Sequence, residues 1–207
     1  MLHSAVDLAD TEGIAAVALS SVAVRAGLSI SAARRTFSSR DRLVAAMVQH
    51  VTARRRRVIA VPQEPITTLT RYAEEEWRNY RTHPWLVGVM ASTRPPLVPA
   101  VLEASGAAIE AFTALGLDAQ TALSRYLALS GYIQGMGLLL MAEHTEAVYS
   151  ESSQRSWWQT EGRRLDRSGA RRRHRWLGEL TDDRAAEFDL DAVFDDGLPR
   201  VIRGLTG

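Results

Sequence analysis

Guanidinium and hydroxyl side chains cluster in a short stretch near the start of the chain. Residues 29–36 read S-I-S-A-A-R-R-T, so two small alanines precede two arginines. An arginine neutralises a phosphate or hydrogen-bonds a guanine edge, and a hydroxyl reaches either group. A small residue allows close approach to a nucleic-acid duplex. The side chains of this stretch that fit contacts with DNA are those of Ser29, Ser31, Ala32, Arg34, Arg35 and Thr36.

Two short helices must position these side chains. The first is predicted over Ser20–Ala26, and Gly27 ends it because glycine accepts the positive φ of a helix end. Leu28 follows as a single apolar plug, and one of the two serines after it caps a second helix that ends near Phe37. Two helices joined in this way form the helix-turn-helix pattern. The same pattern also occurs in helical proteins where a glycine turn merely reverses the chain.

The flanking sequence resembles the TetR family of bacterial transcriptional repressors. The matching motifs are L-H-S-A-V-D-L-A-D-T-E-G-I from Leu2, V-A-V-R-A-G-L-S from Val22 and F-S-S-R-D-R-L-V-A-A-M from Phe37. The resemblance implies an all-α protein with an N-terminal three-helix DNA-binding head. It also implies a larger helical body that forms a homodimer and holds a small-molecule effector.

The resemblance adds DNA-contact positions and shows where this chain departs from the family. Ser20 and Ser21 stand where the family has arginines that contact phosphate, and Arg40 stands where it typically has lysine. Arg34 replaces a tyrosine that packs on the sugar–phosphate backbone, and almost no basic arm precedes the first helix. We therefore keep an alternative open, a helical ligand-binding or protein-interaction module with weakened or lost DNA binding.

The charge distribution favours contact with a polyanion through the head alone. Residues 1–60 hold nine arginines and four acidic residues, whereas residues 61–150 hold five arginines and nine acidic residues. No secretory signal is visible, and the most apolar stretch, Leu127–Ala142, is too short and too rich in glycine to span a membrane. We expect a cytoplasmic protein that binds double-stranded DNA and does not bind a membrane.

Enzymatic and metal chemistry find little support in the sequence. The chain has no cysteine, and its five histidines form no H-x-x-x-H pair, so a zinc site is not expected. No G-x-S-x-G, Walker loop or dinucleotide-binding fingerprint is present. The sequence therefore predicts a protein that is not an enzyme and needs no cofactor.

Composition and proline positions divide the chain into two functional domains. Residues 1–50 form the predicted DNA-binding domain, and its fourth helix continues to near residue 60 as a connector. Residues 61–207 form the predicted ligand-binding and dimerisation domain. Residues 150–187 are predicted to be irregular, because they are polar and rich in arginine. Within the second domain we predict helices over Ile66–Thr82, Leu86–Ser92, Ala100–Leu115, Ala119–Tyr149 and Phe188–Leu205.

Aromatic and apolar residues of the predicted body form a candidate effector pocket. The candidates are Trp77, Tyr80, Trp85, Met90, Phe112, Tyr126, Ile133, Gln134 and Met141. Such a largely apolar lining with few polar anchors is usual for small-molecule sites, although the same pattern also describes plain core packing.

The body resembles the tetracycline-repressor branch in particular. S-T-R-P at Ser92 is similar to that branch's G-T-R-P, and E-H-T at Glu143 also matches it. The branch binds a magnesium–drug chelate through a histidine, whose position here is Met90. Because a thioether is a poor ligand for a hard cation, we expect no metal-dependent effector.

Two further features bear on assembly. The last helix carries apolar residues at helical spacing and needs a partner surface, which supports a homodimer. Its Pro199 should kink it unless the helix restarts there. Trp157 and Trp158 lie in the polar segment before it, where they either anchor a loose connection or close over a pocket.

Overall fold

The computed structural model describes residues 1–53, 64–149, 154–179 and 189–207, and every regular element in these ranges is a helix. The predicted all-α fold class is therefore confirmed. The chain forms two compact units, Met1–Met141 with Asp196–Gly207, and Ala142–Asp195.

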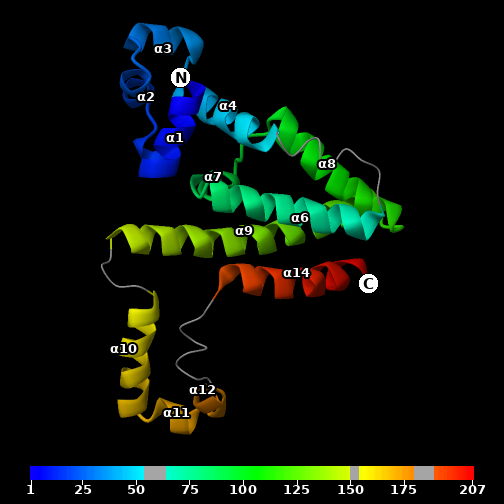
Figure 1. Cartoon of the computed structure of the whole chain (residues 1–207). Coiled ribbons are helices and arrows are strands. Elements are labelled where there is room, and N and C mark those ends of the chain that lie inside the picture. The colour runs from blue at the N-terminus through cyan, green and yellow to red at the C-terminus, as the bar shows by residue number, and fades with distance from the viewer. Residues whose placement is uncertain (54–63, 150–153, 180–188) are drawn as a thin grey trace. The chain divides into compact units, whose positions relative to one another are not determined.

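The first unit begins with a small helical head (Figure 1). Its core is formed by the apolar faces of α1 and α4 and by fully buried residues of the two short helices between them, Val22, Ala23 and Ala33. Because these small residues pack inward, the polar side chains of the same helices face outward. The elements of the head are α1 (Leu2–Glu12), η1 (Ile14–Ala16), α2 (Leu19–Arg25), α3 (Ile30–Thr36) and α4 (Arg40–Thr52).

The turn between α2 and α3 contains a glycine with a positive φ, as the sequence predicted. Gly27 has φ +66°, and the N–H of Leu28 donates to the Ala23 carbonyl at 2.9 Å. Ser29 then caps α3 by accepting a hydrogen bond from the Ala32 N–H at 3.2 Å. The expectation that Leu28 would plug the head core is wrong, since 43% of this residue remains exposed.

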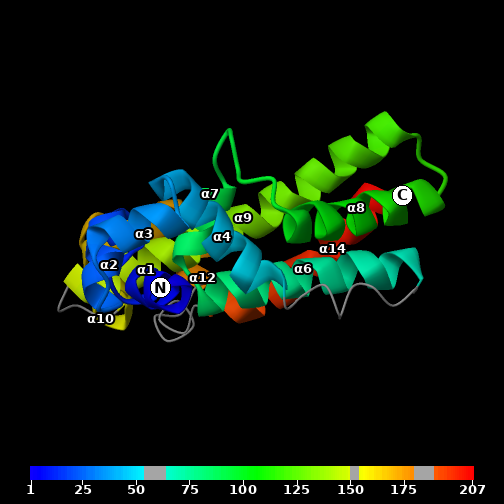
Figure 2. The ribbon, with the colours of Figure 1, turned by 90° about the horizontal axis from the view of Figure 1, so that it is seen from above.

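A helical body follows the head in the same unit (Figures 1 and 2). It consists of α6 (Pro65–Thr82), α7 (Trp85–Met90), α8 (Pro99–Ala114), the part of α9 (Ala119–Tyr149) up to Met141, and the end of α14 (Leu190–Thr206). Pro65 and Pro99 occupy the first positions of their helices, where no N–H is needed. These bounds lie within one or two residues of the predicted ones, and those of α9 match them.

Asp118 caps the start of α9. Its carboxylate accepts hydrogen bonds from the backbone N–H groups of Gln120 and Thr121 at 3.0 and 3.1 Å, and from the Thr121 hydroxyl. The Thr121 hydroxyl is the main cause that holds the pKa of Asp118 below its ordinary value. The cap therefore stabilises the helix with the carboxylate in its charged form.

Small residues set how closely α9 packs on its neighbours. A Cβ at Gly137 would lie 2.8 Å from the Tyr80 ring, and one at Gly197 on α14 would meet the Tyr132 hydroxyl. Gly131 and Gly135 have open space beside them instead. Another helix of the same chain, α6, therefore approaches α9 closely at Gly137.

The second unit corrects the prediction that residues 150–187 are irregular. It contains α10 (Gln154–Arg167), α11 (Ala170–Arg173) and α12 (Arg175–Glu179), with Gly169 at φ +70° between the first two. Trp158, Glu161, Gly162 and Leu165 recur at helical spacing on the less exposed face of α10, where Gly162 is buried and the other three are half-buried. Because only two of these four are large apolar residues, the periodicity was hidden in a polar sequence.

Three earlier expectations concern the ends of helices. The helix α14 runs past Pro199 without a break, so no restart occurs there. We predicted that this helix starts at residue 188 and that α4 continues to near residue 60. Both positions fall outside the described residues. Among the helices that the structure describes, none is long and apolar enough to cross a membrane.

Candidate functional site

Helix α3 presents its polar face to solvent. Ser31, Arg34, Arg35 and Thr36 are exposed, whereas Ala33 is fully buried against the rest of the head. Neither guanidinium forms a hydrogen bond or an ion pair with any residue that the structure describes. Both arginines are therefore available to a ligand that approaches this face.

The remaining polar groups of α3 are partly engaged within the helix itself. Thr36 Oγ1 donates to the Ala32 carbonyl at 3.1 Å, and the Ser29 and Ser31 hydroxyls lie 3.0 Å apart. Ala32 is half-buried and adds no bulk to the outer face. This face can therefore approach a flat or grooved surface closely.

The two serines predicted on α2 differ in their surroundings. Ser20 is exposed. Ser21 is half-buried, and its hydroxyl donates to the Ala16 carbonyl at 2.7 Å and accepts from the Ala18 N–H at 3.0 Å. The structure thus gives Ser21 an internal role at the start of α2, which the sequence did not indicate.

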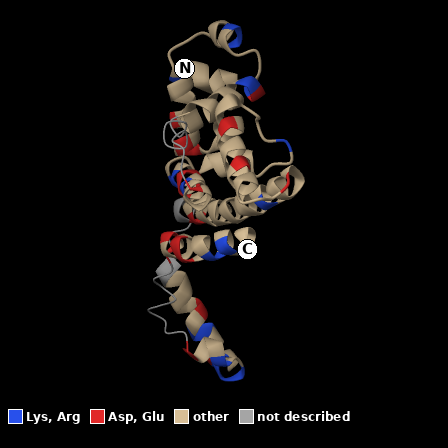
Figure 3. Cartoon of the chain, turned by 90° about the vertical axis from the view of Figure 1, so that its right-hand side faces the viewer, with Lys and Arg blue, Asp and Glu red and all other residues tan. Residues whose placement is uncertain are grey.

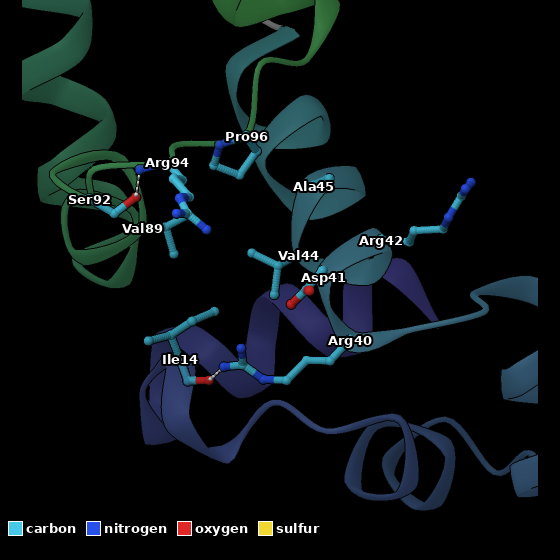
Figure 4. A pocket seen from close by; sticks show the side chains of 10 residues that line it. All are labelled: Ile14, Arg40, Asp41, Arg42, Val44, Ala45, Val89, Ser92, Arg94 and Pro96. Atoms are coloured by element: carbon cyan, nitrogen blue, oxygen red, sulfur yellow. Dashed lines mark hydrogen bonds between the residues drawn. The ribbon is translucent and has the colours of Figure 1, made fainter.

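Arg40 connects the first turn of α4 to η1. Its Nε donates to the Val17 carbonyl and its Nη2 to the Ile14 carbonyl, both at 2.8 Å. Figure 4 shows the bond to Ile14. The side chain nevertheless remains exposed, so its charge is accessible. Arg40 therefore holds the head together, and a contact with phosphate stays a prediction.

Exposed apolar residues beside the turn were missed by sequence reasoning. Val24 is 78% exposed, and Ile30, the first residue of α3, is 48% exposed. Because Val22 and Ala23 complete the buried face of α2, the neighbouring Val24 had to point outward. A period count along this helix could have found it.

Charge on the head is concentrated in few places (Figure 3). Arg25 is paired with Glu12 at 3.0 Å, so its charge is partly compensated. Arg54–Arg57, which supply much of the predicted positive charge, lie outside the described residues. The exposed arginines of α3 and the start of α4 carry the positive charge that the structure places on the head.

The predicted effector-pocket residues come from four helices of the body. Trp77, Tyr80, Trp85, Phe112 and Ile133 are buried. Met90, Tyr126, Gln134 and Met141 are half-buried. The arrangement brings α6, α7, α8 and α9 residues into one unit, which fits both a packed core and the wall of a pocket.

Polar groups in this part of the body are few. Tyr72 on α6 lies 3.3 Å from the Ser130 hydroxyl, and its ring centroid is 5.8 Å from that of Tyr126. The Nδ2 of Asn79 is buried, and none of the described residues accepts a hydrogen bond from it. A buried donor without an acceptor is costly, and one way to satisfy it is a bound molecule. Sequence reasoning did not select Asn79.

Hydrogen bonds connect the head to the body. Asp10 on α1 accepts from the Trp85 Nε1–H at 2.7 Å, and one of its oxygens lies 2.9 Å from His83 Nδ1. Gln49 on α4 accepts from the Ala100 N–H at 3.0 Å. Two helices of the head are therefore tied to the elements that carry the predicted effector pocket. Within the described residues, no group of acidic or histidine side chains could hold a metal ion.

Comparison with known proteins identifies the family. A family model described as the C-terminal domain of tetracycline-repressor-like proteins matches residues 62–207. The chain belongs to the TetR family of transcriptional regulators. A TetR-family regulator is a transcription factor with a ligand-binding domain and is not an enzyme, as the sequence predicted.

Alignments with similar proteins cover nearly the whole chain. The HTH-type transcriptional repressor DrrR1 of Streptomyces coeruleorubidus is 23% identical over 99% of this TetR-family chain and 75% of the relative. The solved structure of SCO7222, a TetR from Streptomyces coelicolor, has a TM-score of 0.75 at 20% identity and covers 99% and 95% of the two chains. ActR of Streptomyces coelicolor in complex with actinorhodin has a TM-score of 0.76 at 18% identity and covers 99% and 92%. These structures share the fold of the whole chain.

Proposed function

We propose that this TetR-family regulator is a repressor that binds an inverted-repeat operator as a homodimer and leaves it when a small, largely apolar molecule binds. The observation that supports DNA binding most directly is the pair of exposed arginines on α3, which have no partner among the described residues. Unpaired arginines on a short helix with a small, polar outer face fit a major groove.

Each exposed residue of this face has a proposed role. Arg34 neutralises a backbone phosphate and Arg35 reaches a base edge. Ile30 and Val24 are apolar and exposed, which suits contact with thymine methyl groups. Arg40 contacts phosphate with the part of its guanidinium that the carbonyls leave free, and the serine, alanine and threonine positions Ser20, Ser29, Ser31, Ala32 and Thr36 support close approach. Ser21 acts mainly as a helix cap.

Exposed leucines on α9 support the homodimer. Leu123, Leu127 and Leu138 are 41–58% exposed along one side of the helix, and Gly131 and Gly135 on the same side have open space beside them. A stripe of this kind is costly to leave in water and fits a second helix at close distance. A dimer with two heads requires operator half-sites about 34–36 Å apart, or a multiple of that.

The effector is proposed to bind among the aromatic residues of α6–α9. The solved structure of the relative ActR in complex with actinorhodin supports a ligand site in a protein of this fold. In this chain Asn79 offers an unpaired buried donor as a polar anchor. Met90 in place of the histidine of the tetracycline-repressor branch favours a ligand without magnesium.

A mobility-shift assay tests the DNA-binding part of the proposal. The purified protein should shift the fragment upstream of its own gene at moderate salt, and the Arg34→Ala/Arg35→Ala variant should not. Sedimentation of the same samples should give a dimer at micromolar concentration. If the wild-type protein sediments as a dimer but shifts no genomic fragment, the alternative of an interaction or ligand-binding module is the better description.

A further inference from the structure

A cleft separate from the predicted effector pocket lies between α4 and a wall formed by the end of α7 and the segment that follows it. Its volume is ≈490 Å³, within the range of about 300–1,000 Å³ usual for small-molecule sites. Val44 and Ala45 of α4 lie on one side, with Val89 and Pro96 on the other (Figure 4). None of the residues predicted for the effector pocket lines this cleft, so it is a distinct candidate site.

The wall formed by the segment after α7 carries an unpaired positive charge. The Arg94 side chain projects into the cleft, and its backbone N–H donates to the Ser92 hydroxyl at 3.3 Å (Figure 4). Its guanidinium has no hydrogen-bond or ion-pair partner in the part of the chain that the structure describes. Arg40 adds a second positive charge where it crosses to Ile14. An apolar cleft with an unpaired guanidinium attracts an organic anion.

The α4 wall carries a negative charge. The Asp41 carboxylate faces the cleft, and no described residue donates a hydrogen bond to it, whereas Arg42 points away (Figure 4). A carboxylate in this position repels an acid group and accepts a hydrogen bond from a hydroxyl or an amine. The two walls therefore specify which end of a bound molecule carries which group.

We propose that this cleft binds an amphipathic organic acid. The acid group pairs with Arg94, the apolar part packs between Val44 and Val89, and a hydroxyl or amine donates to Asp41. Such a ligand touches α4 of the head and the α7–α8 segment of the body at once, so it fixes the orientation of the head. The consequence for operator affinity rests on the proposed function, whereas binding to the cleft does not.

The test uses two probes that differ by one acid group. These are 8-anilinonaphthalene-1-sulfonate and its neutral analogue N-phenyl-1-naphthylamine, titrated by fluorescence into the full-length protein without DNA. Arg94→Gln should weaken binding of the sulfonate about tenfold or more, because a charge-assisted hydrogen bond is lost, and leave the neutral probe unchanged. Asp41→Asn should strengthen binding of the sulfonate. Arg78→Gln is the matched control, since Arg78 is exposed and pairs with Glu75 on α6.

A second variant makes the test independent of Arg94. Ala45→Trp places an indole in the cleft and should weaken both probes, with folding checked by circular dichroism. The proposal is overturned if Arg94→Gln and Ala45→Trp both bind the sulfonate as the wild type does, or if Arg78→Gln weakens it as much as Arg94→Gln. A wild-type protein that binds the probe through Arg94 but shifts no promoter fragment would refute the proposed function and leave the cleft site standing.

Discussion

Two arginines of α3 and three arginines of α10–α12 have different surroundings. On α3, Arg34 and Arg35 are exposed and have no partner among the described residues. On α10–α12, Arg164, Arg171 and Arg175 each lie 2.7–3.0 Å from a carboxylate of the same unit. The comparison shows that the number of arginines in a segment does not indicate a nucleic-acid surface. Arg163, Arg167 and Arg172 of the same unit are exposed and have no partner among the described residues, so internal pairing distinguishes individual arginines rather than whole segments.

The largest expected effect comes from removing both unpaired arginines. Arg34→Ala/Arg35→Ala should lower operator affinity about 100-fold and reduce the salt dependence of binding by about one to two units of slope. Fluorescence anisotropy over a series of salt concentrations measures both quantities. An affinity loss below about threefold would show that α3 is not the DNA-contacting face.

The single variants of Arg34 and Arg35 should distinguish a phosphate contact from a base contact. Arg34→Ala should weaken binding to operator and random DNA alike, because a phosphate contact carries no sequence information. Arg35→Ala should cost about 5- to 150-fold on the operator and much less on random DNA. Competition binding with both DNAs measures the ratio. Equal losses for Arg35→Ala would place this residue on the backbone.

Arg40 combines the properties of the two groups of arginines, since its side chain is exposed and also hydrogen-bonded within the head. Arg40→Ala should lower the free energy of unfolding by about 1–2 kcal/mol, because the Ile14 and Val17 carbonyls lose their donors. It should also reduce the salt slope by about one unit. Arg40→Lys should restore more of the slope than of the stability, as urea unfolding and anisotropy together will show. If Arg40→Lys restores both equally, the two carbonyl bonds contribute little.

The smallest effect on stability and operator affinity is expected for a substitution in the second unit. The side chain of Arg175 is 94% exposed and that of its partner Glu179 is 66% exposed. Pairs of this kind contribute little to stability. Arg175→Ala should leave both the melting temperature and operator affinity unchanged. A clear loss of affinity would mean that paired arginines also contact DNA, and the comparison would fail.

The sequence was sufficient where local rules determine structure. The apolar periodicity predicted α9, and Gly27 with one of the two following serines predicted the turn into α3. The face of α3 followed from the same local spacing. The proposed DNA-contact residues could therefore be chosen before the structure was known, apart from Val24 and Ile30.

The sequence was insufficient where a long-range contact or a weak pattern decides. Arg40 bonds to carbonyls 23 and 26 residues earlier, which no local pattern indicates. The cleft at Arg94 forms from segments about fifty residues apart. Helix α10 was missed because Trp158 and Leu165 are the only large apolar residues on its less exposed face. For Arg40 and for the cleft, residues distant in the sequence determine the structure. For α10, the apolar pattern is too weak to predict the helix.

The carboxylate of Asp10 has a consequence for how the head moves. Its oxygens serve both the Trp85 indole and His83, so one rotation of α1 away from the body breaks both contacts together. Two contacts that break in one step, while the Gln49–Ala100 hydrogen bond of α4 can remain, favour two discrete orientations over a continuous range. We therefore expect exchange on the microsecond-to-millisecond timescale, visible as relaxation dispersion at the Trp85 indole, and its loss in Asp10→Ala.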